Sequence, residues 1–344
     1  MLPRVTIGTR VIDEAHPPML IAEAGINHDG DVQKAIELID AAAEAGADCI
    51  KFQCHIAEAE MIPTDARLGT LSKERVWDLM KRCGLTEEQE QRLKAYCEQK
   101  QIMYLCTPFS REAADRLERL DVLAYKIGSG ECNNVPLIEH VAKKGKPMIV
   151  STGMNDIASI RRSMEAIWRY QVPVILMHCT SMYPTPYEEV RLGAIRELQE
   201  TFRVPVGLSD HSLGIYTCLG AVPLGACVLE KHFTVSRQWP GPDIAISIEP
   251  QELAELVKGA RAVHAARKGS KAILPQERPV IEFAYASVVS LRDIQAGETL
   301  NLDNTWVKRP GTGIPAARLQ EILGREARRP IAADRLVSFD DLTP

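Results

Sequence analysis

The segment MLIAEAG at residues 19–25 is the first of eight short, largely apolar runs that decide the fold. The others read DCIKFQ (48–53), IMYLCTP (102–108), LAYKIGSG (123–130), PMIVSTG (147–153), VILMHCT (174–180), VPVGLSD (204–210) and VLEKHFT (228–234). Helical patterns lie between them, and the runs recur every ~30 residues on average, the length of one β-loop-α unit. Eight such units in a row predict a closed parallel (β/α)8 TIM barrel. An open doubly wound sheet is the alternative, but no G-x-G-x-x-G follows the first run.

Composition and charge narrow the class of protein. The chain has 344 residues, of which 45% are apolar, and 41 Lys+Arg against 46 Asp+Glu give a net charge of −5. Without a basic block, nucleic acid and anionic membranes are not expected as partners. No apolar run is long enough for a transmembrane helix, and the first residues lack a signal-peptide core. The 9 cysteines form no C-x-x-C pair, so we expect reduced thiols in a cytoplasmic protein.

The pattern changes near residue 267. Residues 1–267 carry the barrel units, and residues 268–284, which contain Gly, Ser and two prolines, read as a linker. Residues 285–344 predict a small domain with two strands around a turn at Gly297 and a short helix near residues 316–323. A domain of this size has too small a core to be very stable alone.

The one long spacing follows the second run and leaves an extra loop over residues 56–71. Loops that follow barrel strands lie on the catalytic face. We therefore expect this loop to cover part of the site.

Polar side chains cluster where the predicted strands end. They are Glu23, Lys51, Gln53, Thr107, Lys126, Ser129, Glu131, Ser151, His178 to Ser181, Ser209 to His211, and Glu230 to His232. In a barrel these positions converge on one rim, where barrel enzymes keep their chemistry. Strand ends are also often polar simply because they reach solvent. So many ionisable groups within apolar segments would, however, be costly to desolvate without a function.

Two lysines among these residues suggest an anion site. Lys51 and Lys126 supply positive charge, and Ser129, Ser151 and Ser209 supply hydroxyl donors, as a phosphate with a carboxylate requires. Either lysine alone is equally well explained by reaching to solvent. A further alternative makes Lys126 a Schiff-base lysine that attacks a carbonyl.

Two histidines suggest a metal site. His211 and His232 end adjacent predicted strands, and two imidazoles with open positions suit Mn²⁺, Fe²⁺ or Zn²⁺. A hydrogen-bonded pair of rim histidines explains the same pattern. In the small domain, KRPG at residues 308–311 places Arg309 beside a proline-fixed turn, where arginine is more often a surface residue than a ligand-binding one.

Several ordered motifs resemble the signatures of the sialic acid synthase family, the bacterial N-acetylneuraminate synthases and their nonulosonate relatives. They are AEAGINHDG (22–30), YKIGSGECNN (125–134), STGMN (151–155), HCTSMYPTPYEEVRL (178–192), GLSDHSLG (207–214), LEKHFT (229–234) and GPDIAIS (241–247). The small domain, with DIQAGETL (293–300) and WVKRPGTGI (306–314), resembles the antifreeze-like (SAF) domain of those enzymes. The resemblance covers nearly the whole chain.

The resemblance implies a condensation. Phosphoenolpyruvate adds through C3 to the open-chain aldehyde of N-acetylmannosamine, water attacks C2, and phosphate leaves by C–O cleavage. A divalent metal, most often Mn²⁺ with Mg²⁺ or Co²⁺ as other options, polarises the aldehyde oxygen. Family members need no covalent imine, which argues against the Schiff-base role of Lys126.

The resemblance also implies roles for individual residues. Phosphoenolpyruvate would be held by Lys51, Thr107, Lys126, Ser129, Ser151 and Ser209, and the metal by His211 and His232. Glu131 would be the acid/base group near C2, with Glu23 and Glu230 as further rim carboxylates. The sugar would contact Gln53, Ser181, Tyr183, Asp243 and Phe283. Arg309 would reach the acetamido group from the partner subunit of a domain-swapped homodimer.

Other functions remain open at this point. Bacterial relatives carry Asn where this chain has Ser181, and the loss of its amide hydrogen bonds would alter the preferred sugar. The alternatives are a legionaminate or pseudaminate synthase, which takes a 2,4-diacetamido-2,4,6-trideoxy sugar, an imine-forming pyruvate aldolase, and a non-catalytic sugar-binding or ice-binding protein.

Overall fold

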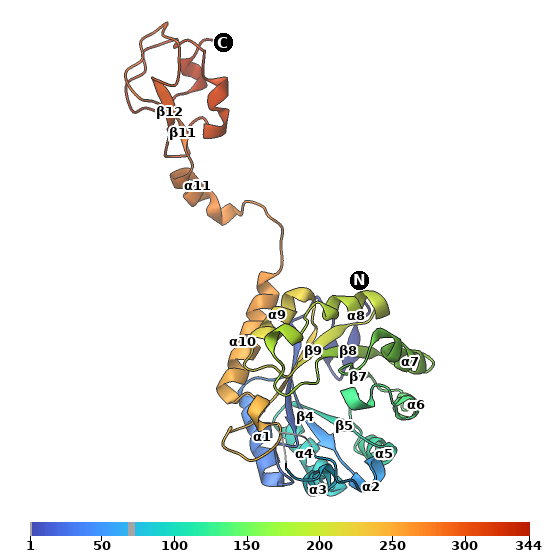
Figure 1. Ribbon diagram of the computed structural model, residues 1–344. Coiled ribbons are helices and arrows are strands. Elements are labelled where there is room, and N and C mark those ends of the chain that lie inside the picture. Colours follow the sequence, from blue (N-terminus) through green and yellow to red (C-terminus); the bar gives the residue numbers. More distant parts are fainter. Residues whose placement is uncertain (1, 68–72) are drawn as a thin grey trace. The chain divides into compact units, whose positions relative to one another are not determined.

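The computed structural model describes residues 2–67 and 73–344 (Figure 1). The chain divides into two compact units, Met1–Lys268 and Gly269–Pro344. Each unit has an apolar core of its own. Within the described residues, no helix combines the length and the apolar character that a membrane crossing requires.

The first unit is a nearly closed barrel of parallel strands surrounded by helices. In the described residues its strands are β3 (Met19–Gly25), β4 (Cys49–Cys54), β5 (Met103–Pro108), β6 (Tyr125–Ile127), β7 (Met148–Ser151), β8 (Val174–Cys179), β9 (Val206–Asp210) and β10 (Val228–His232). They pair in the order β5-β4-β3-β10-β9-β8-β7-β6, and the end strands β5 and β6 also pack against each other. The predicted (β/α)8 barrel is confirmed, since each of the eight apolar runs supplies one strand.

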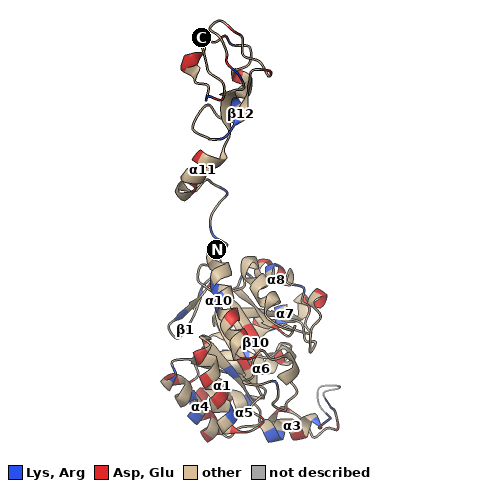
Figure 2. Cartoon of the chain, turned by 90° about the vertical axis from the view of Figure 1, so that its left-hand side faces the viewer, with Lys and Arg blue, Asp and Glu red and all other residues tan. Residues whose placement is uncertain are grey.

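Helices alternate with the strands. They are α1 (Val32–Glu44), α2 (Ala57–Glu60), α3 (Val76–Cys83), α4 (Glu87–Gln99), α5 (Arg111–Arg119), α6 (Val135–Ala142), α7 (Ile157–Trp168), α8 (Ala194–Phe202), α9 (Tyr216–Ala221) and α10 (Pro250–Ala266). Side chains cap several helix starts: the Asp31 carboxylate accepts from the backbone of α1, and Thr86 forms a capping box with Gln89 on α4. Charges of both signs lie scattered over helices such as α1, α4 and α5 (Figure 2).

The extra loop predicted over residues 56–71 contains α2, and its last residues, 68–71, lie outside the described part of the chain.

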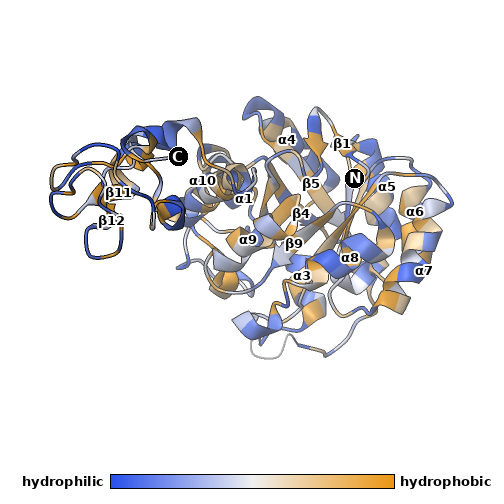
Figure 3. Ribbon diagram, turned by 90° about the horizontal axis from the view of Figure 1, so that it is seen from above, coloured by the Kyte–Doolittle hydropathy of each residue, from blue (hydrophilic) through white to orange (hydrophobic). Residues whose placement is uncertain are grey.

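An N-terminal hairpin fills one end of the barrel. Strands β1 (Val5–Ile7) and β2 (Arg10–Ile12) pair antiparallel, and Val5 and Ile12 belong to the same apolar cluster as Ile21 and Ile149 from the barrel strands. The outer helices carry both hydrophobic and hydrophilic residues, as Figure 3 shows for α6 and α7. Apolar side chains of the hairpin and the strands fill the end of the barrel next to the hairpin. Polar side chains lie instead around the cavity at the carboxyl ends of the strands.

The second unit is small and mixed. It contains α11 (Arg278–Ala284) and the antiparallel pair β11 (Ser287–Ser290) and β12 (Thr305–Lys308). Its core includes Val288, Ile294 and Leu300. The predicted short helix near residues 316–323 is a 3-10 helix, Ala316–Glu321. Part of the segment that reads as a linker in the sequence forms α11, which has no buried residues.

Candidate active site

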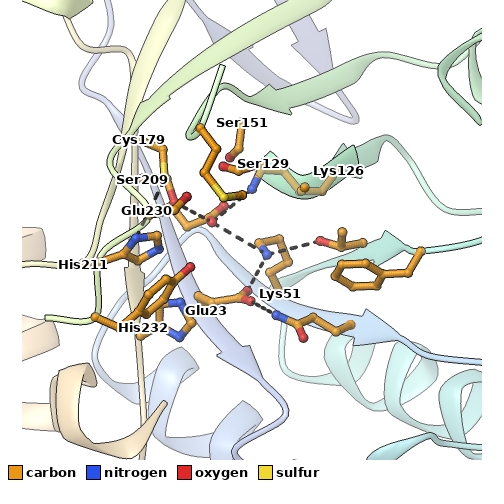
Figure 4. A pocket seen from close by; sticks show the side chains of 18 residues that line it. Glu23, Lys51, Lys126, Ser129, Ser151, Cys179, Ser209, His211, Glu230 and His232 are labelled. Carbon is orange, nitrogen blue, oxygen red and sulfur yellow. Dashed lines mark hydrogen bonds and ion pairs between the residues drawn. The ribbon is translucent and has the colours of Figure 1, made fainter. Parts of the chain in front are cut away.

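A cavity of about 270 Å³ opens at the carboxyl ends of the barrel strands (Figure 4). It is lined by these residues of the predicted site: Glu23, Lys51, Gln53, Thr107, Lys126, Ser129, Ser151, Ser181, Tyr183, Ser209, His211, Glu230 and His232. They lie on strands far apart in the chain or in the loops that follow these strands, and the barrel topology brings them together.

The floor of the cavity is a cluster of alternating charges. The Lys51 ammonium lies 2.6 Å from Glu23 Oε2 and 3.7 Å from Glu230 Oε1. Lys126 Nζ lies 3.1 Å from the same Glu230 oxygen, which also accepts a hydrogen bond of 3.0 Å from Ser209 Oγ. Lys51 also donates to Thr107 Oγ1 at 3.3 Å. Glu230 therefore bridges the two lysines (Figure 4).

Burial and pairing set the protonation of this cluster. Burial alone would raise the pKa of the Glu230 carboxyl, but Lys126 and Lys51 hold it at about 2. Burial disfavours the charged form of Lys51, yet Glu23 and Glu230 raise its pKa. Burial dominates at Lys126, whose pKa is lowered, and at Glu23, whose pKa is raised against the opposing effect of Lys51.

Some buried polar atoms around the cavity have no hydrogen-bond partner. Among the described residues these include Ser151 Oγ, Ser181 Oγ, Glu230 Oε2 and His232 Nδ1. An unsatisfied buried polar group costs about 1–3 kcal/mol. Several of them around one cavity indicate a site whose hydrogen bonds are completed by a polar ligand.

His211 and His232 lie close together, and each has a ring nitrogen that makes no hydrogen bond within the described part of the protein. Their ring centroids are 5.3 Å apart, and the ring of Tyr183 stacks on His211 at 4.2 Å. His211 Nδ1 donates to the Thr180 carbonyl at 2.9 Å, which leaves its Nε2 lone pair available. His232 Nδ1 is buried without a hydrogen bond and lies 3.7 Å from Asp243 Oδ2.

The protonation of the pair differs between its members. Burial lowers the pKa of His232 well below its usual value, which favours the neutral ring that a metal ligand requires. Burial would also favour the neutral form of His211, but Cys179, with Sγ 3.8 Å from Nδ1, raises its pKa. In the described residues, no three His, Cys, Asp or Glu side chains converge as a metal cage. The residues fit a metal bound by two protein nitrogens, with positions left for substrate and water.

Four predicted residues do not line the cavity. Glu131 lies on the 3-10 turn Ser129–Glu131 after β6, and its Oε2 accepts from Asn134 Nδ2 at 2.6 Å. Asp243 lies behind His232, and burial raises the pKa of its carboxyl. Phe283 and Arg309 belong to the second unit, where the Arg309 guanidinium lies 5.6 Å from the centroid of the Phe283 ring.

Apolar lining residues escaped the sequence analysis. Phe109 follows β5 and Met154 lies shortly after β7, and both line the cavity. A search for polar residues at strand ends passes over them. Their position after a strand, which is the same as that of the polar residues, was the available signal.

A TIM barrel with lysines, carboxylates and a histidine pair at the carboxyl ends of its strands has the architecture of a barrel enzyme, with positive charge in the cavity where an anionic substrate would lie. The NeuB family model matches residues 38–272 and the SAF domain model matches residues 285–343. The chain therefore belongs to the NeuB family, the transferases that make nonulosonic acids from phosphoenolpyruvate with a divalent metal.

Individual relatives agree along almost the full length. The chain is 41% identical to protein MJ1065 of Methanocaldococcus jannaschii over 98% of both chains. It is 37% identical to the N,N'-diacetyllegionaminic acid synthase of Campylobacter jejuni, over 93% of this chain and 98% of the relative. Among solved structures, the N-acetylneuraminic acid synthetase of Leptospira borgpetersenii superposes with a TM-score of 0.74 at 34% identity, covering 82% of this chain and 96% of that one.

Proposed function

We propose that this enzyme condenses phosphoenolpyruvate with N-acetylmannosamine to give N-acetylneuraminate and phosphate. The observation that carries the proposal is the cavity floor, where Glu230 bridges two buried lysines beside hydroxyls and a histidine pair. Phosphoenolpyruvate needs cations for its phosphate and carboxylate, and an open-chain sugar needs polar partners for its hydroxyls.

The chain's own groups hold the donor substrate. Lys51 and Lys126 supply two ammonium groups, and the unpartnered Ser151 hydroxyl supplies a directed donor. With the donor fixed, its C3 forms a bond to the aldehyde carbon, and the aldehyde oxygen takes up a proton to become a hydroxyl. Water adds to C2, which lost its double bond to C3 in the first step, and gives up one proton. The bond from C2 to the phosphate oxygen then breaks with its electrons leaving on phosphate, and the C2 hydroxyl gives its remaining proton to the phosphate, so that C2 becomes the ketone.

Two carboxylates are available for the proton transfers inside the cavity, and a third lies close by. Glu23 and Glu230 line the cavity, and Glu131 lies two residues beyond the lining residue Ser129. We assign the acid/base role near C2 to Glu131. Glu230, held ionised by both lysines, keeps these cations in place.

His211 and His232 would hold the divalent metal, which we assign as Mn²⁺ and which when bound supplies a Lewis acid for the aldehyde oxygen. Chelation with EDTA should abolish phosphate release from phosphoenolpyruvate plus N-acetylmannosamine, and added Mn²⁺ should restore it. Activity that survives thorough chelation would contradict the role of both histidines.

A second acceptor is favoured by one comparison. The Campylobacter jejuni relative, a diacetyllegionaminic acid synthase, is 37% identical, against 34% for the Leptospira sialic acid synthetase. The Ser181 hydroxyl in the cavity wall has no partner, and it leaves room and a donor for an additional acetamido group. The candidate acceptor is then a 2,4-diacetamido-2,4,6-trideoxy sugar.

The deciding experiment is mass analysis of the product from phosphoenolpyruvate and a panel of acetamido sugars. N-acetylneuraminate as the fastest product supports the first proposal, and a diacetamido product supports the second. Absence of any condensation product would refute both. Borohydride trapping of a pyruvate adduct on Lys126 would instead favour an imine-forming aldolase.

We also propose a domain-swapped homodimer in which Arg309 contacts the acceptor sugar of the partner subunit. Arg309→Ala should raise the acceptor KM more than the phosphoenolpyruvate KM. At substrate concentrations far below the raised KM values, a mixture of Arg309→Ala and Lys126→Met protein should be more active than either variant alone, because each mixed dimer holds one intact site. An unchanged acceptor KM would refute the contact.

A further inference from the structure

A chain of hydrogen bonds leads from the cavity to the short helix α2. Gln53, which lines the cavity, donates from Nε2 to Glu23 Oε1 at 3.0 Å. Its Oε1 lies 3.0 Å from His55 Nε2. The other ring nitrogen of His55, Nδ1, lies 3.0 Å from each carboxylate oxygen of Glu60. The side chains of His55 and Glu60 are both 4% exposed, so this pair is shielded from water.

The carboxylates of Glu23 and Glu60 at the two ends of this chain determine which groups donate and which accept. The Glu23 carboxylate, ion-paired with Lys51 through its other oxygen, accepts hydrogen bonds, so the NH2 group of Gln53 points toward it. The amide oxygen then faces His55, which donates from Nε2. The Glu60 carboxylate requires a second donor, which is Nδ1–H of the same ring.

This arrangement leaves Gln53 with one unused group. Its carbonyl oxygen is engaged by His55 and one amide hydrogen by Glu23. The second amide hydrogen is free to enter the cavity. Gln53 therefore presents an N–H donor to whatever binds there, and rotation of the amide by half a turn would break both existing bonds.

We infer that the Glu60–His55 pair is a positioning device that locks the Gln53 amide so that its N–H meets an oxygen acceptor of the sugar. The inference rests on the proposed function for the identity of the ligand. His55 is held in its own plane by stacking on Phe109, with ring centroids 4.4 Å apart and an angle of 14°. Neither His55 nor Glu60 lines the cavity, so both act through Gln53.

The first test is direct and does not depend on the reaction. In protein labelled with ¹⁵N-histidine, both ring nitrogens of His55 should show hydrogen-bond couplings or shifts that report their contacts with Gln53 and Glu60, and Glu60→Gln should change the signal of Nδ1. A wild-type ring in which either nitrogen has no hydrogen-bond partner would overturn the proposal.

The second test is kinetic. Glu60→Gln should raise the KM for the acceptor sugar about 10-fold, the loss of one well-oriented hydrogen bond, with the phosphoenolpyruvate KM and kcat changed less than about twofold. Glu58→Gln is the matched control, because Glu58 lies on the same helix, is 61% exposed and pairs with Lys81 at 2.9 Å. It should leave both KM values unchanged.

A double-mutant cycle separates positioning from general stability. In a Gln53→Met background, Glu60→Gln should have no further effect on the acceptor KM, since its target is gone. Additive effects, or an equal rise in both KM values with a lower melting temperature, would overturn the positioning role. If the wild type condenses no sugar at all, the proposed function fails and the sugar contact with it, while the nitrogen spectrum still reports whether the Glu60–His55 pair is as described.

Discussion

The substitution Lys231→Met removes one half of a buried ion pair that joins β9 to β10. Lys231 Nζ lies 2.6 Å from Asp210 Oδ2, and each side chain is 1% exposed. Each member directly precedes one of the two cavity histidines, His211 and His232. Methionine has a similar length, so the substitution removes the charge without opening a large void.

The expected loss in the free energy of unfolding depends on the hydrogen bonds that the remaining member of the ion pair keeps. Loss of one member of a buried ion pair costs about 3–5 kcal/mol. After Lys231→Met, the Asp210 carboxylate keeps Thr217 Oγ1 at 2.7 Å and Ser212 Oγ and N at 3.0 and 3.1 Å. We therefore expect the lower end, about 3 kcal/mol. After Asp210→Asn, the Lys231 ammonium keeps the carbonyl of Ser212 and loses its countercharge, so we expect about 5 kcal/mol.

Urea unfolding followed by the helical circular dichroism signal measures this loss in the barrel, because α11 is the only α-helix of the second unit, whose residues are all described. Lys146→Met is the matched control. Its partner Asp121 lies 2.7 Å away but is 89% exposed, so the loss should stay below about 1 kcal/mol. Equal losses for Lys231→Met and Lys146→Met would refute the reasoning, as would a smaller loss for Asp210→Asn than for Lys231→Met.

Three further outcomes follow from the cavity. Lys126→Met should raise the phosphoenolpyruvate KM about 10–100-fold in steady-state assays. Burial lowers the pKa of Lys126, so the wild-type kcat/KM for phosphoenolpyruvate should fall at a lower alkaline pH than it would if this residue had the pKa of an ordinary lysine. An acceptor KM that rises instead would contradict this placement. Glu131→Gln should lower kcat by about 10²–10⁴ with little change in either KM. An unchanged kcat would contradict the acid/base role of Glu131 and leave Glu23 as the candidate for it. Since the pKa of Glu230 falls from 4.5 to about 2 on folding, its contribution to stability is complete above pH 4.5 and is lost as the pH falls toward 2; urea midpoints of Glu230→Gln should accordingly vary less over this range than those of the wild type.

The sequence was sufficient to predict the barrel and most of the cavity. Parallel strands in a barrel present all their carboxyl ends at one rim, so residues as distant as Lys51, Lys126 and Glu230 meet without any other information. The apolar runs identify the strands, and the last residues of each run identify the rim. The partners within the cluster, with Glu230 bridging both lysines, depend on the register between strands, which no single run contains.

Loop residues and the second unit were harder to place. Glu131 lies on a 3-10 turn, and its side chain accepts a hydrogen bond from Asn134. Its distance in sequence from the end of β6 does not specify the direction in which this side chain points. The contact of Arg309 with Phe283 joins the end of β12 to α11, elements separated in sequence by all of β11 and the loop after it. Such contacts depend on tertiary packing rather than on a local period.

The alternation of side chains along β9 and β10 explains why the site and its support share the same short segments. Successive residues of a strand point to opposite faces. On β10, Glu230 and His232 line the cavity while Lys231 points to the helix side, and on β9, Ser209 lines the cavity while Asp210 meets Lys231 behind it. The ion pair thus fixes the two strand ends relative to each other at the point where they deliver the cavity residues. If every polar residue at a strand end is assigned to the rim, residues that line the cavity and residues that support the strands are not distinguished. The alternation of side chains along a strand, with its period of two residues, distinguishes them.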